Sequence, residues 1–154
     1  MKEKELLILA NLRQNSRETL TSISHKTKVP ISTIFDKMKS LEQDIITKHT
    51  TIVDFSKLGF STRANMTLRV DKNERDRIKD YLEKHQNVNT IYKINNGYDF
   101  LIEAIFRNIR ELEEFQENLD AKFKIKERQV YYIIEDIKRE AFMSDPSLIG
   151  ILNC

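Results

Sequence analysis

The sequence of 154 residues is poor in cysteine, histidine and glycine, and it contains no tryptophan. Its one cysteine, Cys154, excludes a disulfide within the chain and is consistent with a reducing compartment. Three glycines cannot build the glycine-rich loop that cradles a phosphate group. His25, His49 and His85 are far apart and lack the spacing of metal ligands. No nucleophile motif is present, so we expect no enzyme, no cofactor and no metal.

Long apolar runs are missing as well. No stretch reaches the roughly 18 apolar residues of a membrane span, and there is no signal-peptide pattern. We therefore expect a cytoplasmic protein without a membrane partner. The net charge of +2 is unevenly distributed, because residues 1–53 hold nine Lys or Arg against six Asp or Glu. Residues 54–154 hold seventeen against eighteen. The small positive surplus thus lies near the N-terminus, where it suits phosphate binding.

Residues 19–42 contain two short helical patterns that meet at Pro30. Proline has no backbone N–H and disfavours a helical conformation at Val29, so the chain must turn there. Residues 2–14 predict a helix before these two, and Thr19 is suited to cap the second helix. We expect the three helices to share one core of Leu6, Leu9, Leu20, Ile23, Ile34, Met38 and Leu41. This is the layout of a helix-turn-helix that reads DNA.

The second half predicts a sheet with two helices. Apolar residues alternate from Ala64 to Val70, which indicates a strand with one buried face. A helix over 72–86, strands over 88–94, 98–106 and 130–134, and a helix after Asn108 complete the order βαββαβ. Asn96 and Gly97 predict a type I′ turn, and Asn108 with Glu111 a capping box. The predicted fold class is α+β, a winged helix-turn-helix followed by a ferredoxin-like sandwich.

The boundaries that follow are 1–53 for the winged helix-turn-helix, 54–60 for a hinge, 61–140 for the sandwich and 141–154 for a C-terminal tail. Residues 46–53 are rich in β-branched side chains and predict one or two short strands, a basic wing. The tail could be a small helix, a swapped arm or a disordered segment. These three alternatives stay open.

The sheet face opposite the two helices should be polar in a monomer. We place five apolar residues there, namely Ile91, Leu101, Ile105, Tyr131 and Ile133. Burial of this face against a second copy is the favoured explanation, and coverage by residues 141–152 is the alternative.

A helix that enters the major groove needs short polar side chains near its N-terminus and cations for phosphates. The candidate DNA-binding residues in and before the second helix of the motif are Pro30, Ile31, Ser32, Thr33, Asp36, Lys37, Lys39 and Ser40. Arg17, Lys48 and His49 are candidates for phosphate contacts. An ordinary solvated helix face is the alternative interpretation.

Four stretches resemble the Lrp/AsnC (feast/famine) transcription regulators of archaeal type. They are LRQNSR at 12–17, PISTIFDKMKSLE at 30–42, LGF at 58–60 and NGYDF at 96–100. The resemblance implies a winged helix-turn-helix, a sandwich domain that dimerises and often assembles further, and in many members an amino-acid effector near the hairpin. The effector residues would then be Asn96, Gly97, Tyr98 and Asp99.

The sequence departs from the family pattern at three places. Gln43 and Asp44 stand where a glycine often precedes the wing, and Lys28 stands at a common turn glycine. Lys124 with Ile125 replaces a frequent Gly-Val pair before the last strand. These departures concern the turn geometry and the effector site more than the DNA-reading helix.

Two function classes remain. The first is a sequence-specific regulator that binds double-stranded DNA as a homodimer or higher oligomer, with a possible amino-acid effector. The second is a ligand-carrying or protein–protein interaction module without a DNA role. Retention on non-specific DNA that is lost as salt rises distinguishes them.

Overall fold

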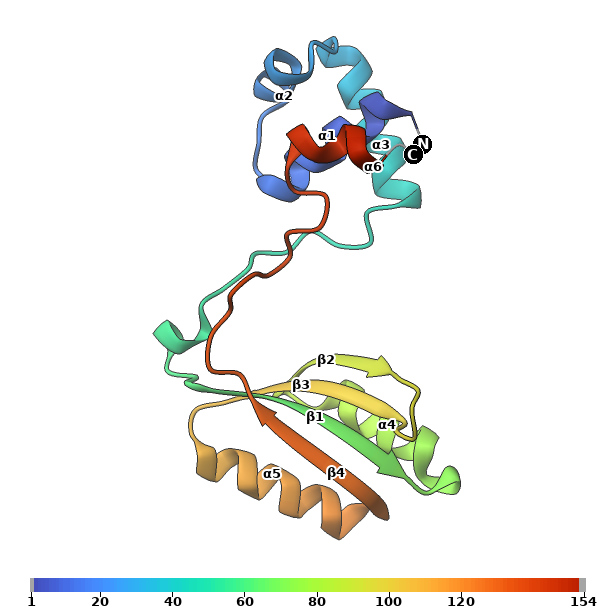
Figure 1. The fold of residues 1–154 in the computed structure, drawn as a ribbon, viewed down its shortest axis with the longest axis vertical. Helices are drawn as coiled ribbons and strands as arrows, with labels where there is room; N and C mark the ends of the chain where they lie inside the picture. Colours follow the sequence, from blue (N-terminus) through green and yellow to red (C-terminus); the bar gives the residue numbers. More distant parts are fainter. Residues whose placement is uncertain (1, 153–154) are drawn as a thin grey trace. The chain divides into compact units, whose positions relative to one another are not determined.

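The computed structural model of the protein describes residues 2–152. Within this range the chain forms two compact units, one of residues 2–52 and 137–152 and one of residues 53–136. Figure 1 follows the chain through both units. Cys154 lies outside the described residues. From residue 2 to residue 152, no helix has both the length and the apolar character that crossing a membrane requires.

The first unit contains the predicted helix-turn-helix. Its helices are α1 (Glu3–Gln14), α2 (Leu20–Thr27) and α3 (Ile31–Asp44). Thr19 caps α2, as predicted, because its hydroxyl oxygen accepts a hydrogen bond of 3.1 Å from the backbone N–H of Ser22. Lys28 ends α2 in the left-handed conformation with φ of 57°, which is the geometry that a glycine would adopt at lower cost.

Helix α1 is buried on two sides, which the sequence analysis did not predict. Leu6 was expected in the core of the three helices, but it packs with Ala10 against Ile149 from the C-terminal segment. The core between the three helices is formed by Ile8, Leu12, Ile23, Val29, Ile34 and Leu41. Residues 6–10 are all apolar, and a helix that is apolar on more than one side is stable only when both sides are covered.

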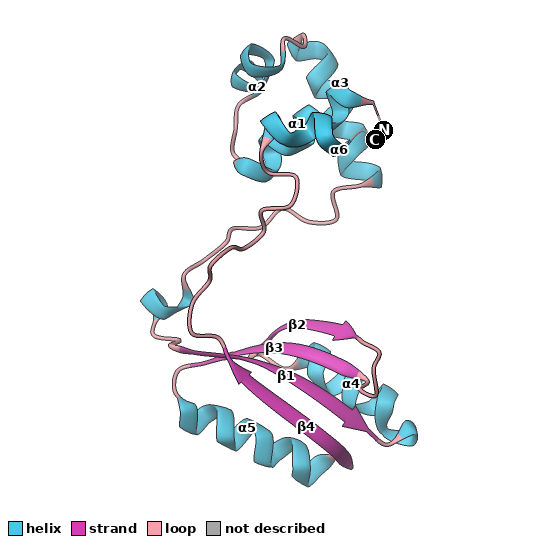
Figure 2. Cartoon of the chain, in the orientation of Figure 1, coloured by secondary structure: helices cyan, strands magenta, loops and turns pink. Residues whose placement is uncertain are grey.

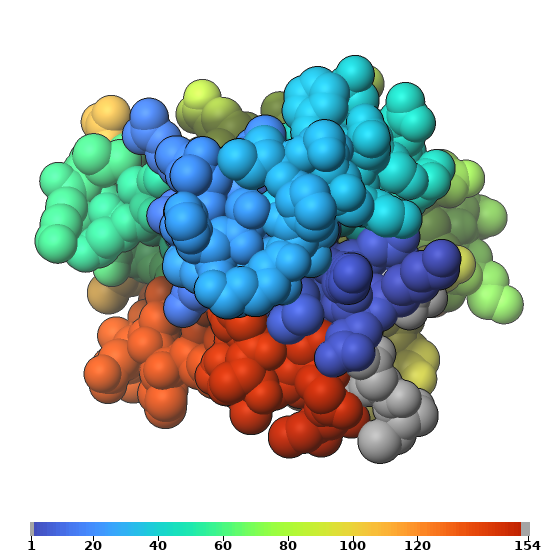
Figure 3. Space-filling model, turned by 90° about the horizontal axis from the view of Figure 1, so that it is seen from above, coloured from blue at the N-terminus to red at the C-terminus, as the bar shows by residue number. Residues whose placement is uncertain are grey.

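The C-terminal segment is docked on α1. It ends in a short 3-10 turn, Pro146–Leu148, and the helix α6 (Ile149–Leu152). Figure 3 shows this segment, in red, packed beside α1, in dark blue. Arg13 of α1 donates from Nε to the carbonyl oxygen of Phe142 at 2.7 Å and from a terminal nitrogen to that of Glu140 at 3.1 Å. Of the three alternatives left open for these residues, the structure thus has a small helix on an ordered segment.

The predicted wing strands are wrong. Residues 46–54 form no strand, although they all belong to the described part of the chain. The β-branched residues do favour an extended backbone, but a strand also requires a neighbouring backbone to pair with. Ile46 packs instead against the core of the three helices.

The second unit is an antiparallel sheet with two helices on one face, as Figure 2 shows. Its elements are η1 (Phe55–Leu58), β1 (Thr62–Val70), η2 (Lys72–Glu74), α4 (Arg75–Lys84), β2 (Val88–Lys93), β3 (Phe100–Phe106), α5 (Ile109–Lys122) and β4 (Ile125–Tyr132). The strand order is β2-β3-β1-β4, and every neighbouring pair is antiparallel. This is the ferredoxin-like arrangement, so the predicted α+β fold class is confirmed.

The local signals of this unit behave as predicted, except for one half of the capping box at the start of α5. Ala64, Met66 and Leu68 are fully buried on the face that the helices cover. Asn96 and Gly97 have φ of 60° and 84°, the two positive values that a type I′ turn requires. The side-chain oxygen of Asn108 accepts a hydrogen bond of 3.0 Å from the N–H of Glu111 and caps α5. The second half of the predicted capping box is absent, because the Glu111 carboxylate accepts from the N–H of Arg107 at 3.0 Å and not from that of Asn108.

One predicted side-chain orientation in this unit is wrong. Ile91 pairs with Ile102 and packs against the core under the helices, so it does not lie on the open sheet face. The cause is an irregularity between Val88 and Thr90, which shifts the alternation of β2 by one residue. At the first position of α5, Ile109 is 58% exposed, whereas Leu112 and Phe115 of the same helix are buried.

Candidate nucleic-acid interface

Helix α3 has one buried side and one polar, exposed side. Ile34 and Leu41 are buried in the core of the three helices. The exposed polar residues of the helix are Ser32, Thr33, Asp36, Lys39, Ser40, Glu42, Gln43 and Asp44. Because residues three and four apart share a face, Ser32, Asp36 and Gln43 line up opposite Ile34. Gln43 was not among the predicted DNA-facing residues, although its helical spacing from Ile34 and Leu41 indicates that it lies on this exposed side.

The N-terminal end of α3 is open. Pro30 stands at the capping position, and no side chain from the described residues caps this end. The backbone N–H groups of Ile31, Ser32 and Thr33 therefore lack the intrahelical partners that later residues have. They lie at the positive end of the helix dipole, which attracts anions such as a DNA phosphate.

The two lysines of α3 differ in their surroundings. Lys37 points toward α1, where its Nζ lies 2.5 Å from Oε1 of Glu5. This hydrogen bond is the main reason why the pKa of Glu5 is lowered. Lys39 is exposed, and its Nζ lies 4.5 Å from the centre of the Phe35 ring. Lys39 is thus the lysine of α3 whose charge faces solvent, and Lys37 is partly neutralised within the protein.

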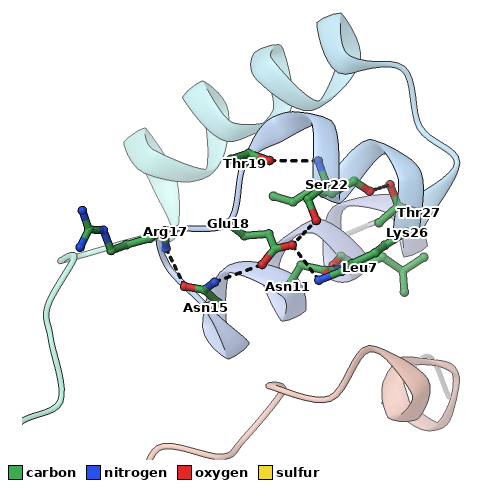
Figure 4. A network of polar contacts seen from close by, with 10 residues as sticks. Leu7, Asn11, Asn15, Arg17, Glu18, Thr19, Ser22, Lys26 and Thr27 are labelled. Carbon is green, nitrogen blue, oxygen red and sulfur yellow. Dashed lines mark hydrogen bonds and ion pairs between the residues drawn. The ribbon is translucent and has the colours of Figure 1, made fainter.

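Arg17 precedes α2 in a polar network that Figure 4 shows. The carboxylate of Glu18 accepts hydrogen bonds from the Ser22 hydroxyl, from Lys26 at 2.7 Å and from Asn15 at 3.1 Å. The bond from Lys26 is the first cause of the lowered pKa of Glu18. The backbone N–H of Arg17 donates to the Asn15 side chain at 3.1 Å, while its guanidinium points away from the network. The network therefore fixes the backbone at Arg17, and the charged guanidinium group of Arg17 remains available to contact a partner.

Lys48 and His49 lie in the extended segment after α3, and both are exposed. Nε2 of His49 is 3.4 Å from Oε1 of Glu42, near the C-terminal end of α3. The predicted DNA-facing residues thus all belong to the first unit, but they come from three segments of the chain, before α2, in α3 and after α3.

The predicted effector residues lie at the hairpin between β2 and β3. The carboxylate of Asp99 is 10% exposed, and both of its oxygens have partners. One lies 2.6 Å from a terminal nitrogen of Arg75, and the other accepts a hydrogen bond of 2.8 Å from the N–H of Val70. The Asp99 carboxylate therefore ties the hairpin to the start of α4, and an incoming ammonium group would compete with Arg75 for it.

Tyr98 reaches past β1 to β4, the edge strand on the other side of the sheet from β2. Its hydroxyl donates a hydrogen bond of 2.6 Å to Oε1 of Glu127, and this bond is the main reason why the pKa of Tyr98 is raised. The other carboxylate oxygen of Glu127 lies 2.9 Å from Arg69. The hairpin is thus surrounded by paired charges. Across residues 2–152, no group of three or more His, Cys, Asp or Glu side chains is placed to hold a metal ion.

The sequence profile of the Lrp/AsnC ligand binding domain matches residues 63–142, which is more than half of the chain. The chain belongs to the Lrp/AsnC family of transcription regulators. Among its relatives is an uncharacterized HTH-type transcriptional regulator of Pyrococcus furiosus, 24% identical over 140 residues that cover 90% of this chain and 94% of the relative. The HTH-type transcriptional regulator FL11 of Pyrococcus abyssi is 28% identical over 109 residues, which cover 70% of this chain and 72% of the relative.

Solved structures of Lrp/AsnC proteins share this fold. AsnC of Escherichia coli has a TM-score of 0.80 at 18% identity, with 90% of this chain and 95% of that chain covered. A transcriptional regulator of Neisseria meningitidis in complex with L-Met has a TM-score of 0.84 at 17% identity, with coverages of 90% and 93%. These likenesses extend over both units, so the resemblance noted in the sequence and the family it predicted are confirmed.

For this member of the Lrp/AsnC family, the profile match includes the hairpin at 96–99 and all of the sheet except Thr62, the first residue of β1. Helix α3 lies outside the matched range, and its relation to the family depends on the relatives that cover both units. The residues of α3 must therefore be judged on their own geometry.

Proposed function

We propose that this chain regulates transcription by binding double-stranded DNA as a dimer or higher oligomer, with α3 lying in the major groove. The observation that carries the proposal is the outer side of α3, which combines short polar side chains, an exposed lysine and an uncapped N-terminal end. Major-groove readers place such a helix end against base edges and phosphates. The names of the Pyrococcus relatives, HTH-type transcriptional regulators, support the same function.

From the geometry, we assign each DNA-facing residue to base edges or to phosphates. Ser32, Thr33 and Asp36 are short, exposed and near the start of α3, so we assign them to base edges. Lys39 and Arg17 are exposed cations, and we assign them to phosphates. Lys37 contributes less than the sequence suggested, since Glu5 already holds its ammonium group. The residues that flank these and complete the proposed surface are Pro30, Ile31, Ser40, Lys48 and His49.

A gel-shift series across salt concentrations tests this function. The unmodified protein should bind duplex DNA with an affinity that falls steeply as salt rises. Lys39→Ala should flatten the slope of log affinity against log salt by about 0.9, the value for one lost phosphate contact. The matched control is Lys79→Ala, because Lys79 is exposed on α4 of the other unit beside Glu83. Binding that is absent, or insensitive to salt, would exclude the function.

We also propose that the open sheet face is the dimer surface. Leu101 and Tyr131 lie on it together with the exposed ring of Tyr92, and the ion pair between Arg69 and Glu127 borders them. Ile105 has the same orientation but is already buried, with 8% of its surface exposed. Apolar side chains on an open sheet favour burial against a second copy. Light scattering should find a dimer that Leu101→Asp converts into monomers. Ile109→Asp, which places the same charge on α5, should leave the dimer intact.

A small effector at the hairpin is the third part of the proposal. The match to a ligand binding domain supports it, as does the bound L-Met of the Neisseria protein. Asn96, Gly97, Tyr98 and Asp99 are the candidate contacts, with Arg75 as the group that an amino acid's ammonium would replace at Asp99. Calorimetry with a panel of amino acids should give heat for at least one of them. No heat and no shift in melting temperature with any member would indicate a regulator without such an effector.

A further inference from the structure

Helix α3 exposes two large apolar side chains beside its polar face. Ile31 is 45% exposed and Phe35 is 49% exposed, and neither belongs to the core that holds Ile34 and Leu41. They are four residues apart, so they lie one above the other on the same side of the helix. Apolar groups of this size are not needed for a solvated helix face, and their position next to Ser32 and Asp36 places them at the proposed DNA surface.

Lys39 continues the same stripe by one more turn. Its ammonium group lies over the Phe35 ring, 4.5 Å from the ring centre, in a cation–π contact. This contact occupies one face of the ring and leaves the rest of the half-exposed ring open to solvent. The stripe therefore presents apolar surface near the start of α3 and a positive charge one turn further toward the C-terminal end of the helix.

Base pairs offer one apolar group in the major groove, the C5-methyl group of thymine, and aromatic and aliphatic side chains are its usual contacts. We propose that Phe35, assisted by Ile31, contacts thymine methyl groups and thereby selects binding sites that contain thymine at defined positions. Lys39 orients the Phe35 ring and directs its own charge toward a phosphate. This inference depends on the proposed function, because it requires α3 to lie in the major groove.

A thymine-to-uracil exchange tests the proposal with the complete chain. A DNA duplex is recovered from a random pool by the purified protein, and its thymines are replaced by deoxyuridine one at a time. Uracil keeps the hydrogen-bonding groups of thymine and lacks only the methyl group. Binding of the unmodified protein should weaken roughly fourfold for each contacted methyl group that is removed.

Three variants complete the experiment. Phe35→Ala should bind equally well the two duplexes that differ at the methyl group contacted by Phe35, whereas Phe35→Leu should keep part of that discrimination because it keeps an apolar side chain. Ile109→Ala is the matched control, since Ile109 is 58% exposed on α5 in the other unit and should leave the ratio unchanged. Circular dichroism verifies that each variant is folded.

The outcomes separate this inference from the proposed function. If the protein binds DNA with the expected salt dependence but ignores every thymine-to-uracil exchange, the methyl contact is excluded and the DNA-binding function stands. Discrimination that persists undiminished at every thymine position in Phe35→Ala would likewise overturn the role of Phe35. If no duplex is bound at low salt, both proposals fail.

Discussion

The two units of the protein assemble their cores in different ways. The core of the sandwich is formed by residues between Ala64 and Phe123, all within one continuous stretch. The first unit depends on both ends of the described chain, because Leu6 and Ala10 of α1 pack against Ile149 of α6. The first unit thus requires a segment that follows the sandwich in sequence. Residues 2–52 by themselves would leave one apolar side of α1 uncovered.

This difference separates local from distant causes of stability. Each sandwich helix has one apolar stripe and finds its partner in the adjacent sheet. Helix α1 has apolar residues on two sides and finds its second partner more than a hundred positions later in the sequence. The comparison predicts that disturbing the C-terminal segment affects the first unit and leaves the sandwich unchanged. Hydrogen exchange with peptide resolution can follow each unit separately.

The largest expected effect comes from a charge placed at Ile149, where α6 packs against Leu6 and Ala10 of α1. Ile149 is 1% exposed, and Ile149→Asp would bury an unpaired carboxylate, at a cost of about 3–5 kcal/mol in the local stability of the first unit. Hydrogen exchange should accelerate in α1. Ile151→Asp is the control, because Ile151 is 70% exposed on the same helix. Equal acceleration in β1 and α1 would contradict the independence of the two cores.

The reciprocal change concerns the sandwich. Leu112 is fully buried on the inner side of α5, and Leu112→Ala should cost about 2–5 kcal/mol through lost contacts and a residual cavity. Chemical denaturation measures the loss, and hydrogen exchange assigns it to β1 and β3. The exposed neighbour variant Ile109→Ala should change stability by less than about 0.5 kcal/mol. If α1 opened as readily as β1 in Leu112→Ala, the sandwich would not be the separate core described above.

A smaller effect is expected at Arg13. Its guanidinium donates to the carbonyl oxygens of Phe142 and Glu140, and its side chain is partly exposed. Arg13→Ala should therefore cost about 1 kcal/mol, with the effect confined to α1 and residues 137–152. Arg110→Ala removes a solvent-exposed pair on α5 and serves as the matched control. Exchange in the C-terminal segment that is identical in both variants would exclude an anchoring role for Arg13.

The smallest effect concerns pH and belongs to the sandwich alone. Burial, and secondly the charge of Lys122, lowers the pKa of His85 below its ordinary value of 6.5. His85 packs against Phe115 at a ring-centre distance of 4.7 Å and against Tyr81 at 5.5 Å. The unfolded chain therefore takes up the proton first, and stability should decrease as pH falls through 6.5 toward the lowered pKa.

His85→Gln removes this titration. The two conditions are pH 8 and pH 5, about one and a half units on either side of the ordinary histidine pKa. Denaturation curves of the sandwich at these two pH values should differ less in the variant than in the unmodified protein. A pH dependence that is unchanged in His85→Gln would assign it to other groups.

The sandwich could be predicted from the sequence because its signals are local. The alternation from Ala64 to Val70, the Asn96–Gly97 turn and the Asn108 cap each depend on neighbouring residues, and the structure has all three. The wrong predictions concern features that also depend on residues distant in the sequence. Ile91 lies on the other face because of an irregularity in β2, and the predicted wing strands are absent because residues 47–53 make no backbone hydrogen bond to any described segment.

For the candidate DNA surface, the turn at Pro30 and the buried side of α3 were predictable, but the contacts of its side chains were not. Nothing in the spacing of Lys37 indicates that Glu5 of α1 would hold its ammonium group. Phe35 lies between Ile34 and Asp36, and only the helical phase relative to Ile34 and Leu41 shows that it faces outward. The docking of residues 140–149 on α1 has no local signal, because it depends on the return of the chain to its first helix.

Dimethyl sulfate protection tests the central claim, that α3 reads the major groove, most directly. This reagent methylates guanine at N7, which lies in the major groove, and adenine at N3, which lies in the minor groove. On a duplex selected by the complete protein, guanine N7 should be protected in two half-sites about 34–36 Å apart or a multiple of that distance. The protection should weaken as salt rises and in Lys39→Ala. Protection of adenine N3 alone, or of no base at any ionic strength, would contradict the account.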